Sequence, residues 1–145
     1  MFIENLNKTL NLGEKLSKRL NPDSIVLLQG PIGVGKTSFV QGIGKGLSIS
    51  EDITSPTFAL SHHYYSGKIP LIHLDLYRLK NSFSAREVFF SEEEEALQNQ
   101  AILIIEWPEL IEPIVKDFWK IEISYAKDYG RHYKIRDPKN LLTFS

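Results

Sequence analysis

The stretch Gly30-Pro31-Ile32-Gly33-Val34-Gly35-Lys36-Thr37 matches the pattern G-x-x-x-x-G-K-[ST] at each of its fixed positions. A short apolar run, Ile25-Val26-Leu27-Leu28, precedes it and reads as a buried strand. Apolar residues recur at helical spacing after it, namely Phe39, Val40, Ile43 and Leu47. Because this pattern binds phosphate when it joins a strand to a helix, the sequence predicts a P-loop that binds a nucleoside triphosphate and magnesium.

The residue types of the loop suit a phosphate ligand. Glycines let successive backbone N–H groups turn inward and approach phosphate oxygens, and the following helix directs its positive end toward the same anion. We expect Lys36 to reach the β- and γ-phosphates and the Thr37 hydroxyl to bind Mg²⁺. The predicted nucleotide-binding residues of this segment are Gly30, Ile32, Gly33, Val34, Gly35, Lys36, Thr37 and Ser38.

A P-loop requires an acidic residue at the end of a neighbouring strand to hold magnesium, directly or through water. Two acidic residues at the ends of apolar runs are candidates for this role. Glu106 ends the run of residues 101–105, and Asp75 ends residues 70–74. The first run is apolar throughout, as expected of a central parallel strand beside the P-loop strand, whereas the second contains His73. We therefore favour Glu106 for magnesium and Asp75 for orienting the attacking water or for a second metal contact. A cap on the following turn is the alternative for Asp75.

Other polar residues leave alternatives open. The segment Thr54-Ser55-Pro56-Thr57 lies where P-loop proteins often place a loop that senses the γ-phosphate, so Thr57 is a candidate contact to magnesium or its water, and a plain turn fits almost as well. Trp107 could stack on a base or on a partner protein, or it could occupy a half-buried position in the core. Arg131 could approach the nucleotide, or it could face solvent on the hairpin. The four histidines show no metal-ligand spacing, and we assign them no catalytic role.

The remaining patterns predict the fold class. A helix is expected over the leucines near the amino terminus, and another over residues 84–97. Residues 57–65 and 69–74, and residues 119–125 and 131–136, read as two hairpins. We predict a single domain over residues 1–145, an α/β, P-loop NTPase-like three-layer sandwich with a mostly parallel central sheet and hairpin additions.

Composition narrows the function. The chain has 145 residues and a net charge of −1, with 17 basic and 18 acidic residues and no cysteine. Without a basic face, a role on nucleic acid needs a partner's surface, and without cysteine there are no disulfides or thiolate metal sites. We find no signal peptide and no apolar stretch long enough to cross a bilayer, and we expect a cytoplasmic protein without membrane contact.

The sequence also bears on the nucleotide and on the reaction. Neither an Asn/Thr-Lys-x-Asp motif nor an Asp-x-x-Gly switch of the guanine-specific GTPases occurs, so ATP is the expected nucleotide. A small-molecule kinase is the main alternative to an ATP hydrolase, although the arginines are few and scattered. A third possibility is a nucleotide-gated assembly factor with negligible turnover.

The order of motifs resembles the TsaE (YjeE) family, small bacterial ATPases of the tRNA threonylcarbamoyladenosine pathway. After the P-loop come Ser-Pro-Thr-Phe at residues 55–58, His-x-Asp-Leu-Tyr-Arg-Leu at 73–79, Ile-Glu-Trp-Pro-Glu at 105–109 and Gly-Arg-x-x-x-Ile at 130–135. The resemblance extends over residues 6–136. Two departures are Pro31-Ile32 where the family usually has Asp-Leu, and residues 86–97, which lack the family's glycine and carry four acids at 92–95.

The resemblance implies roles for these residues. It places residues 33–37 on the phosphates and Thr37 with Glu106 on Mg²⁺, marks Asp75 as important for ATPase activity, and puts Thr57 in a switch-like segment. The adenine end would lie near the first helix and the hairpin at Gly130 and Arg131. The implied partners are TsaD and TsaB, whose complex modifies position 37 of tRNAs that read ANN codons, so tRNA would be met only indirectly.

Overall fold

The computed structural model describes residues 1–139, so the last six residues of the predicted domain lie outside it. Its strands are β1 (Phe2–Ile3), β2 (Ile25–Gln29), β3 (Ser61–Tyr64), β4 (Leu71–Asp75), β5 (Ile102–Glu106), β6 (Phe118–Tyr125) and β7 (Arg131–Arg136). Its helices are α1 (Leu6–Ser17), α2 (Lys36–Gly46) and α3 (Ser82–Asn99), with the short 3₁₀ helices η1 (Pro108–Leu110) and η2 (Glu112–Ile114).

The strands form one sheet in the order β1-β7-β6-β2-β5-β4-β3. Its centre, β6-β2-β5-β4, is parallel, whereas β3 pairs with β4, β7 with β6, and β1 with β7 in antiparallel fashion. The prediction of a mostly parallel centre with hairpin additions is confirmed. All five residues of β5 are buried, which explains why that strand is apolar up to its final acid.

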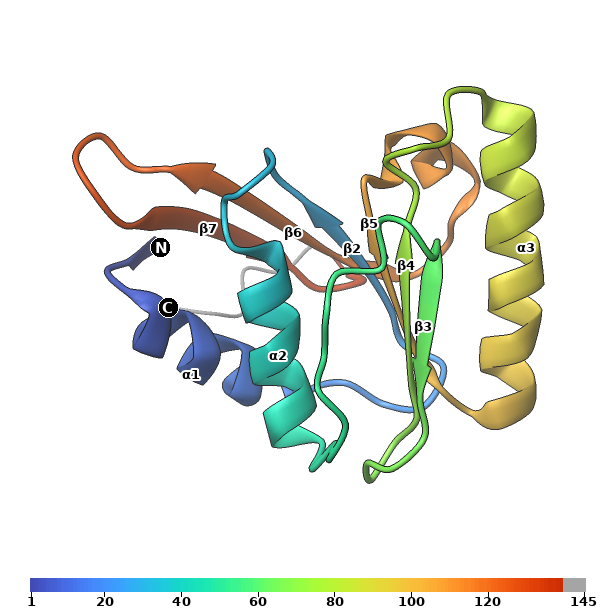
Figure 1. Ribbon diagram of the computed structural model, residues 1–145, viewed down its shortest axis with the longest axis horizontal. Helices are drawn as coiled ribbons and strands as arrows, with labels where there is room; N and C mark the ends of the chain where they lie inside the picture. The colour runs from blue at the N-terminus through green and yellow to red at the C-terminus, as the bar shows by residue number, and fades with distance from the viewer. Residues whose placement is uncertain (140–145) are drawn as a thin grey trace.

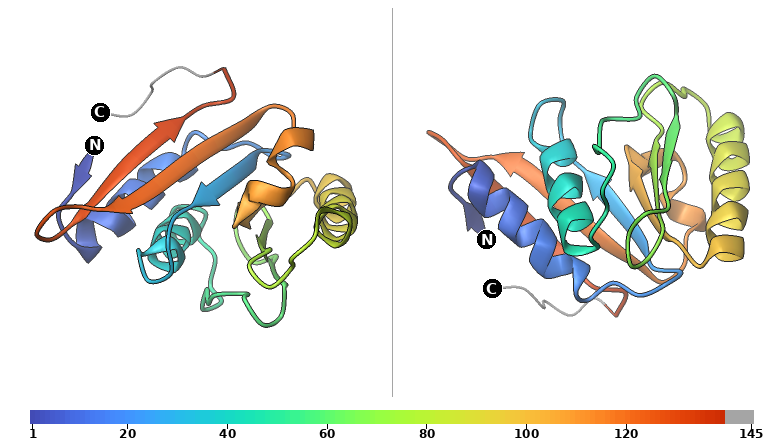
Figure 2. Two further views of the ribbon diagram at one scale, coloured as in Figure 1. Left: turned by 90° about the horizontal axis from the view of Figure 1, so that it is seen from above. Right: turned by 60° about the horizontal axis from the view of Figure 1, so that its bottom comes forward.

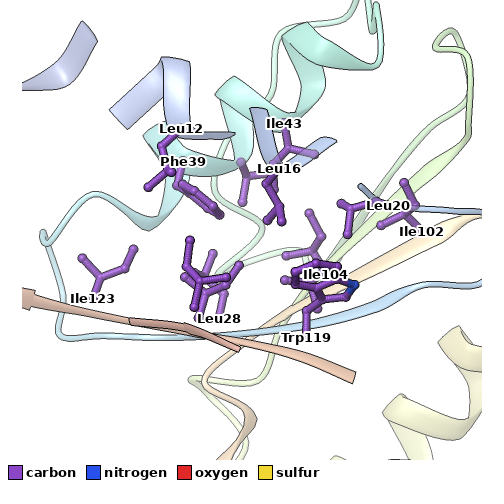
Figure 3. Close-up of a cluster of buried hydrophobic side chains, with 14 of the residues drawn as sticks. Leu12, Leu16, Leu20, Leu28, Phe39, Ile43, Ile102, Ile104, Trp119 and Ile123 are labelled. Carbon is purple, nitrogen blue, oxygen red and sulfur yellow. The ribbon is translucent and has the colours of Figure 1, made fainter. Parts of the chain in front are cut away.

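Helices cover the sheet in two layers. Helices α1 and α2 lie on one face and α3 lies on the other (Figures 1 and 2). Leu12 and Leu16 of α1 and Phe39 and Ile43 of α2 point toward the sheet, where they meet side chains such as Ile104 (Figure 3). A second cluster, which includes Phe89, fills the space beneath α3. The predicted three-layer sandwich is therefore present.

Two segments differ from the sequence prediction. Strand β3 begins at Ser61, so residues 57–60 are not part of the predicted strand. There the chain turns at Leu60, whose φ is 70°, and the Leu60 carbonyl accepts a hydrogen bond from the Asp75 N–H. The short strand β1 was not predicted, because two residues carry no detectable period.

The acidic run on α3 does more than face solvent. Glu92 accepts hydrogen bonds from Ser61 at 2.9 Å and from His63 at 2.8 Å, and Glu95 lies 3.5 Å from the Tyr65 hydroxyl. These contacts join α3 to the edge of the sheet at β3.

No helix within residues 1–139 is both long enough and apolar enough to span a membrane.

Candidate active site

The phosphate loop connects β2 to α2, as the motif predicted. Gly33 and Gly35 adopt left-handed backbone conformations with φ of 80° and 112°, which side chains disfavour. Gly35 is also the residue that caps α2, and its position supplies no side-chain hydrogen bond to the helix. The first N–H groups of α2 therefore face the loop without competition from a capping side chain, as an anion-binding helix end requires.

Lys36 is the buried cation of the loop, with 7% of its surface exposed. Its ammonium donates hydrogen bonds to the carbonyl oxygens of Gly30 and Pro31. The nitrogen also lies 4.1 Å from the centroid of the Trp107 ring, which in turn packs against Tyr77 at 4.8 Å between ring centroids. Trp107 is half-buried, and its ring contacts the Lys36 ammonium.

Asp75 and Glu106 are register partners at the carboxyl ends of the neighbouring parallel strands β4 and β5. Asp75 is buried, and its Oδ2 accepts a hydrogen bond from the Thr57 hydroxyl at 2.8 Å. Its Oδ1 accepts from the Tyr77 N–H at 2.8 Å. Asp75 therefore caps the following turn and also reaches the predicted sensor segment, so the two interpretations of this residue are compatible.

Burial disfavours the charged forms of Asp75 and Lys36 in this cluster. Burial raises the pKa of Asp75, hydrogen bonds from Tyr77 and Thr57 oppose the shift, and the nearby charge of Glu106 adds to it. Burial lowers the pKa of Lys36, against the attraction of Glu106 and Asp75. Two close carboxylates and a desolvated ammonium favour a ligand that carries both a cation and anionic oxygens.

His73 also belongs to this cluster, although sequence reasoning assigned it no role. It is fully buried, and its Nε2 lies 2.5 Å from Oε2 of Glu106. Alternation along β4 places His73 and Asp75 on the same face of the sheet, and Asp75 pairs with Glu106 on the next strand. The spacing His-x-Asp before a strand end was the signal that could have identified it.

The predicted catalytic and metal residues line one cavity of about 240 Å³. Its walls are Ile32, Gly33, Gly35, Lys36, Thr37, Ser38, Ser55, Thr57, Asp75, Glu106 and Trp107. The loop, the sensor segment and the two strand-end acids thus converge from four separate parts of the sequence.

A second cavity of about 250 Å³ adjoins the first, sharing Gly33, Gly35 and Ser38 with it. It is lined by Ile3, Glu4, Asn5, Leu6, Thr9, Gly33, Val34, Gly35, Ser38, Gly130 and Arg131. This is the region near the first helix and the Gly130 hairpin where we expected the adenine end. A Cβ at Gly130, whose φ is 78°, would lie 2.6 Å from the Phe2 ring, so glycine permits β1 to close this side.

The β6–β7 hairpin contacts the backbone of the phosphate loop. Arg131 donates from Nε to the Val34 carbonyl at 2.8 Å, and its guanidinium lies 4.6 Å from the centroid of the Tyr125 ring. The Tyr125 hydroxyl donates to the Ile32 carbonyl at 3.1 Å. Arg131 is therefore not a solvent-facing hairpin residue, because its side chain holds the loop while it lines the second cavity.

Comparisons with known proteins show the family of this chain. The profile of the family described as "Threonylcarbamoyl adenosine biosynthesis protein TsaE" matches residues 3–133. A "tRNA threonylcarbamoyladenosine biosynthesis protein TsaE" from Nostoc sp. is 40% identical over 137 residues, which cover 93% of this chain and 83% of the relative. Its namesake from Synechocystis sp. is 45% identical over 112 residues, 74% of this chain and 69% of the relative.

A solved structure shows the same fold. The crystal structure of YdiB from Bacillus subtilis superposes with a TM-score of 0.74 and 26% sequence identity, covering 92% of this chain and 80% of that one. The P-loop NTPase-like fold is thereby confirmed. With the match over residues 3–133, the chain belongs to the TsaE family of tRNA threonylcarbamoyladenosine biosynthesis proteins.

Proposed function

We propose that this chain is a magnesium-dependent ATPase that acts with the TsaD–TsaB complex. Its ATP binding and hydrolysis would support formation of threonylcarbamoyladenosine at position 37 of tRNAs that read ANN codons. The observation that carries the proposal is the cavity in which Lys36, Thr37, Asp75 and Glu106 meet beside the first N–H groups of α2. Membership of the TsaE family supplies the pathway.

The residues of the cavity fit magnesium. Thr37, Asp75 and Glu106 offer hydroxyl and carboxylate oxygens, the ligand type that Mg²⁺ prefers. Within residues 1–139 no group of three or more histidine, aspartate or glutamate side chains could hold a metal alone, which suits an ion that also uses phosphate oxygens and water. Thr37 and Glu106 would hold it, and when bound it would neutralise charge on the β- and γ-phosphate oxygens.

The chain's own groups then have distinct tasks. The Lys36 ammonium would leave the carbonyls of the loop to bind the terminal phosphoryl oxygens, where it stabilises developing charge. Asp75, held by the Thr57 hydroxyl, would accept a hydrogen bond from the attacking water. The sensor segment and the acid it contacts would therefore respond to the same phosphate.

The near-neutral charge supports a partner-dependent role. With 17 basic and 18 acidic residues, the chain carries no excess positive charge for holding tRNA by itself. The TsaD–TsaB complex would hold the tRNA, and this chain would contact tRNA only indirectly.

The decisive experiment follows phosphate release from ATP and Mg²⁺ by the chain alone, by TsaD–TsaB alone and by the three proteins together. We expect little release by the chain alone, clear stimulation in the mixture, and threonylcarbamoyladenosine in tRNA only when ATP turns over. Phosphate transferred solely to a small acceptor would instead identify a kinase. Magnesium-dependent ATP binding without turnover in any mixture would identify a nucleotide-gated assembly factor.

A further inference from the structure

His73 is a buried polar residue that none of the steps above uses. It lies in the middle of β4, where it pairs with Ile104 of β5 on one side and with His62 of β3 on the other. None of its surface is exposed, so its imidazole cannot contact the nucleotide from solvent. Any effect of His73 on the cavity must therefore pass through a neighbouring side chain.

That neighbour is Glu106. As a magnesium ligand Glu106 acts as a carboxylate, which only accepts hydrogen bonds, so in that role its short contact with His73 is a hydrogen bond donated by Nε2–H. The other ring nitrogen, Nδ1, is buried, and no described residue provides it with a partner. A bare Nδ1 leaves a lone pair unused, which is more common in proteins than a buried N–H without an acceptor. The contacts thus select the tautomer that donates toward Glu106.

This hydrogen bond engages one carboxylate oxygen of Glu106, and the same residue lines the cavity. The imidazole is fixed by a strand on either side, whereas a glutamate side chain has several rotatable bonds of its own. A rigid donor on a central strand therefore selects one orientation of a flexible acid that lines the magnesium side of the site.

We propose that His73 is a positioning residue that holds Glu106 in its magnesium-binding orientation. The inference rests on the proposed function, in which Glu106 is a magnesium ligand. A histidine that orients a ligating carboxylate acts as other outer-shell partners of metal sites do, and the loss of such partners typically lowers metal affinity or activity about 10- to 100-fold.

The test compares three substitutions. His73→Leu keeps most of the volume and removes the donor. His73→Gln can place an amide N–H close to the position of Nε2, and His73→Asn places its amide near Nδ1, away from Glu106. If the leucine variant fails to fold, the glutamine and asparagine pair decides the question, since both are polar and only one can reach the carboxylate.

Two measurements are made on each variant. Calorimetry gives the affinity for a non-hydrolysable ATP analogue in Mg²⁺ and in EDTA, and steady-state assays with TsaD–TsaB give kcat and KM. The Mg²⁺-dependent gain is the ratio of the affinity in Mg²⁺ to the affinity in EDTA. We expect His73→Leu and His73→Asn to lower both this gain and kcat by about 10- to 100-fold. Affinity in EDTA should be unchanged, and His73→Gln should recover most of the loss.

A double-mutant cycle shows whether the effect passes through Glu106. In a Glu106→Gln background, His73→Leu should cause no further loss of the Mg²⁺-dependent gain. The inference is overturned if His73→Leu retains the parent's gain, if affinity in EDTA falls equally, or if the two substitutions are additive. A parent chain that shows no Mg²⁺-dependent gain at all would instead overturn the proposed function, and this inference with it.

Discussion

Two regions adjoin the phosphate loop, and their contacts differ in kind. On the inner side, the ends of β4 and β5 bring together buried side chains, namely Asp75, Glu106 and His73. On the outer side, the partly exposed residues Tyr125 and Arg131 of the β6–β7 hairpin bind carbonyl oxygens of the loop. On the inner side His73 contacts Glu106, and Asp75 accepts hydrogen bonds from the Thr57 hydroxyl and the Tyr77 N–H, whereas the outer contacts run from side chains to carbonyls of the loop.

The difference separates chemistry from loop geometry. Burial raises the pKa of Asp75 and lowers that of Lys36, so keeping both groups charged reduces stability until a ligand compensates, which is typical of functional sites. The hairpin residues bind backbone carbonyl groups of the loop, so we expect them to shape the loop rather than to act on the reacting phosphate. Substitutions on the two sides should therefore change different kinetic quantities.

The largest effect is expected from Lys36→Ala, because among residues 1–139 the buried Lys36 ammonium is the one cation that lines the first cavity. Removing it should lower ATP hydrolysis by roughly 10²–10³-fold or more, as for other preorganised charges in active sites. Phosphate release with TsaD–TsaB measures this loss. The exposed Lys45 of the same helix is the matched control, and Lys45→Ala should behave like the parent. Equal activity of the two variants would refute the role of Lys36.

The next effect concerns Asp75→Asn, which keeps the shape of the side chain and removes its charge. If Asp75 orients the attacking water, kcat should fall by about 10²-fold. Affinity for a non-hydrolysable ATP analogue should change little, because Lys36 and the loop amides remain. A fall in affinity as large as the fall in kcat would assign Asp75 to ground-state binding, and Thr57→Val provides a second test of the same contact.

On the outer side, Arg131→Ala should mainly raise KM. It removes the hydrogen bond to the Val34 carbonyl, and a hydrogen bond from a charged group contributes about 1.5–3 kcal/mol, reduced here by partial exposure. We expect KM to rise about 10-fold with kcat nearly unchanged, since loop geometry affects binding of nucleotide before and during reaction alike. Arg86→Ala on the exposed surface of α3 is the control. A selective loss of kcat would contradict the division between the two sides.

A smaller change is expected from Tyr125→Phe, which removes one hydroxyl that donates to the Ile32 carbonyl. An uncharged hydrogen bond contributes about 0.5–1.5 kcal/mol at most, so KM should rise by about 2- to 5-fold. Tyr129→Phe, on the exposed tip of the same hairpin, removes a hydroxyl away from the loop and should have no effect. If both variants match the parent, the aromatic ring of Tyr125 rather than its hydroxyl supports Arg131.

The smallest effect is on stability and depends on pH. Because folding raises the pKa of Asp75 above its ordinary value of 3.8, the folded state binds that proton more tightly than the unfolded state. The contribution of Asp75 to stability is therefore greatest at low pH and falls as pH rises through the raised pKa. Asp75→Asn abolishes this dependence.

Urea unfolding without nucleotide or Mg²⁺ measures that effect between about pH 4 and pH 7. We expect the free energy of unfolding of the asparagine variant to gain on that of the parent as pH increases. Two stability curves that stay parallel over this range would show that Asp75 carries no electrostatic cost in the folded protein.

Much of the fold followed from local pattern. The loop Gly30–Thr37, the strand before it and the helix after it were predictable because each is specified by residues that are close in sequence. The apolar run ending at Glu106 predicted a central parallel strand, and β5 does lie beside β2. The start of β3 could not be predicted, since the turn at Leu60 is joined by a hydrogen bond to the distant Asp75.

The sequence by itself determined the phosphate loop, the two candidate acids and the motif order that resembles the TsaE family, because these depend on residue type and spacing alone. Only the tertiary structure placed His73 against Glu106 and Arg131 against the loop carbonyl of Val34, pairs that are 33 and 97 residues apart. Those contacts arise from the register of neighbouring strands and the return of the β6–β7 hairpin. Local sequence carries no period that reports such pairings.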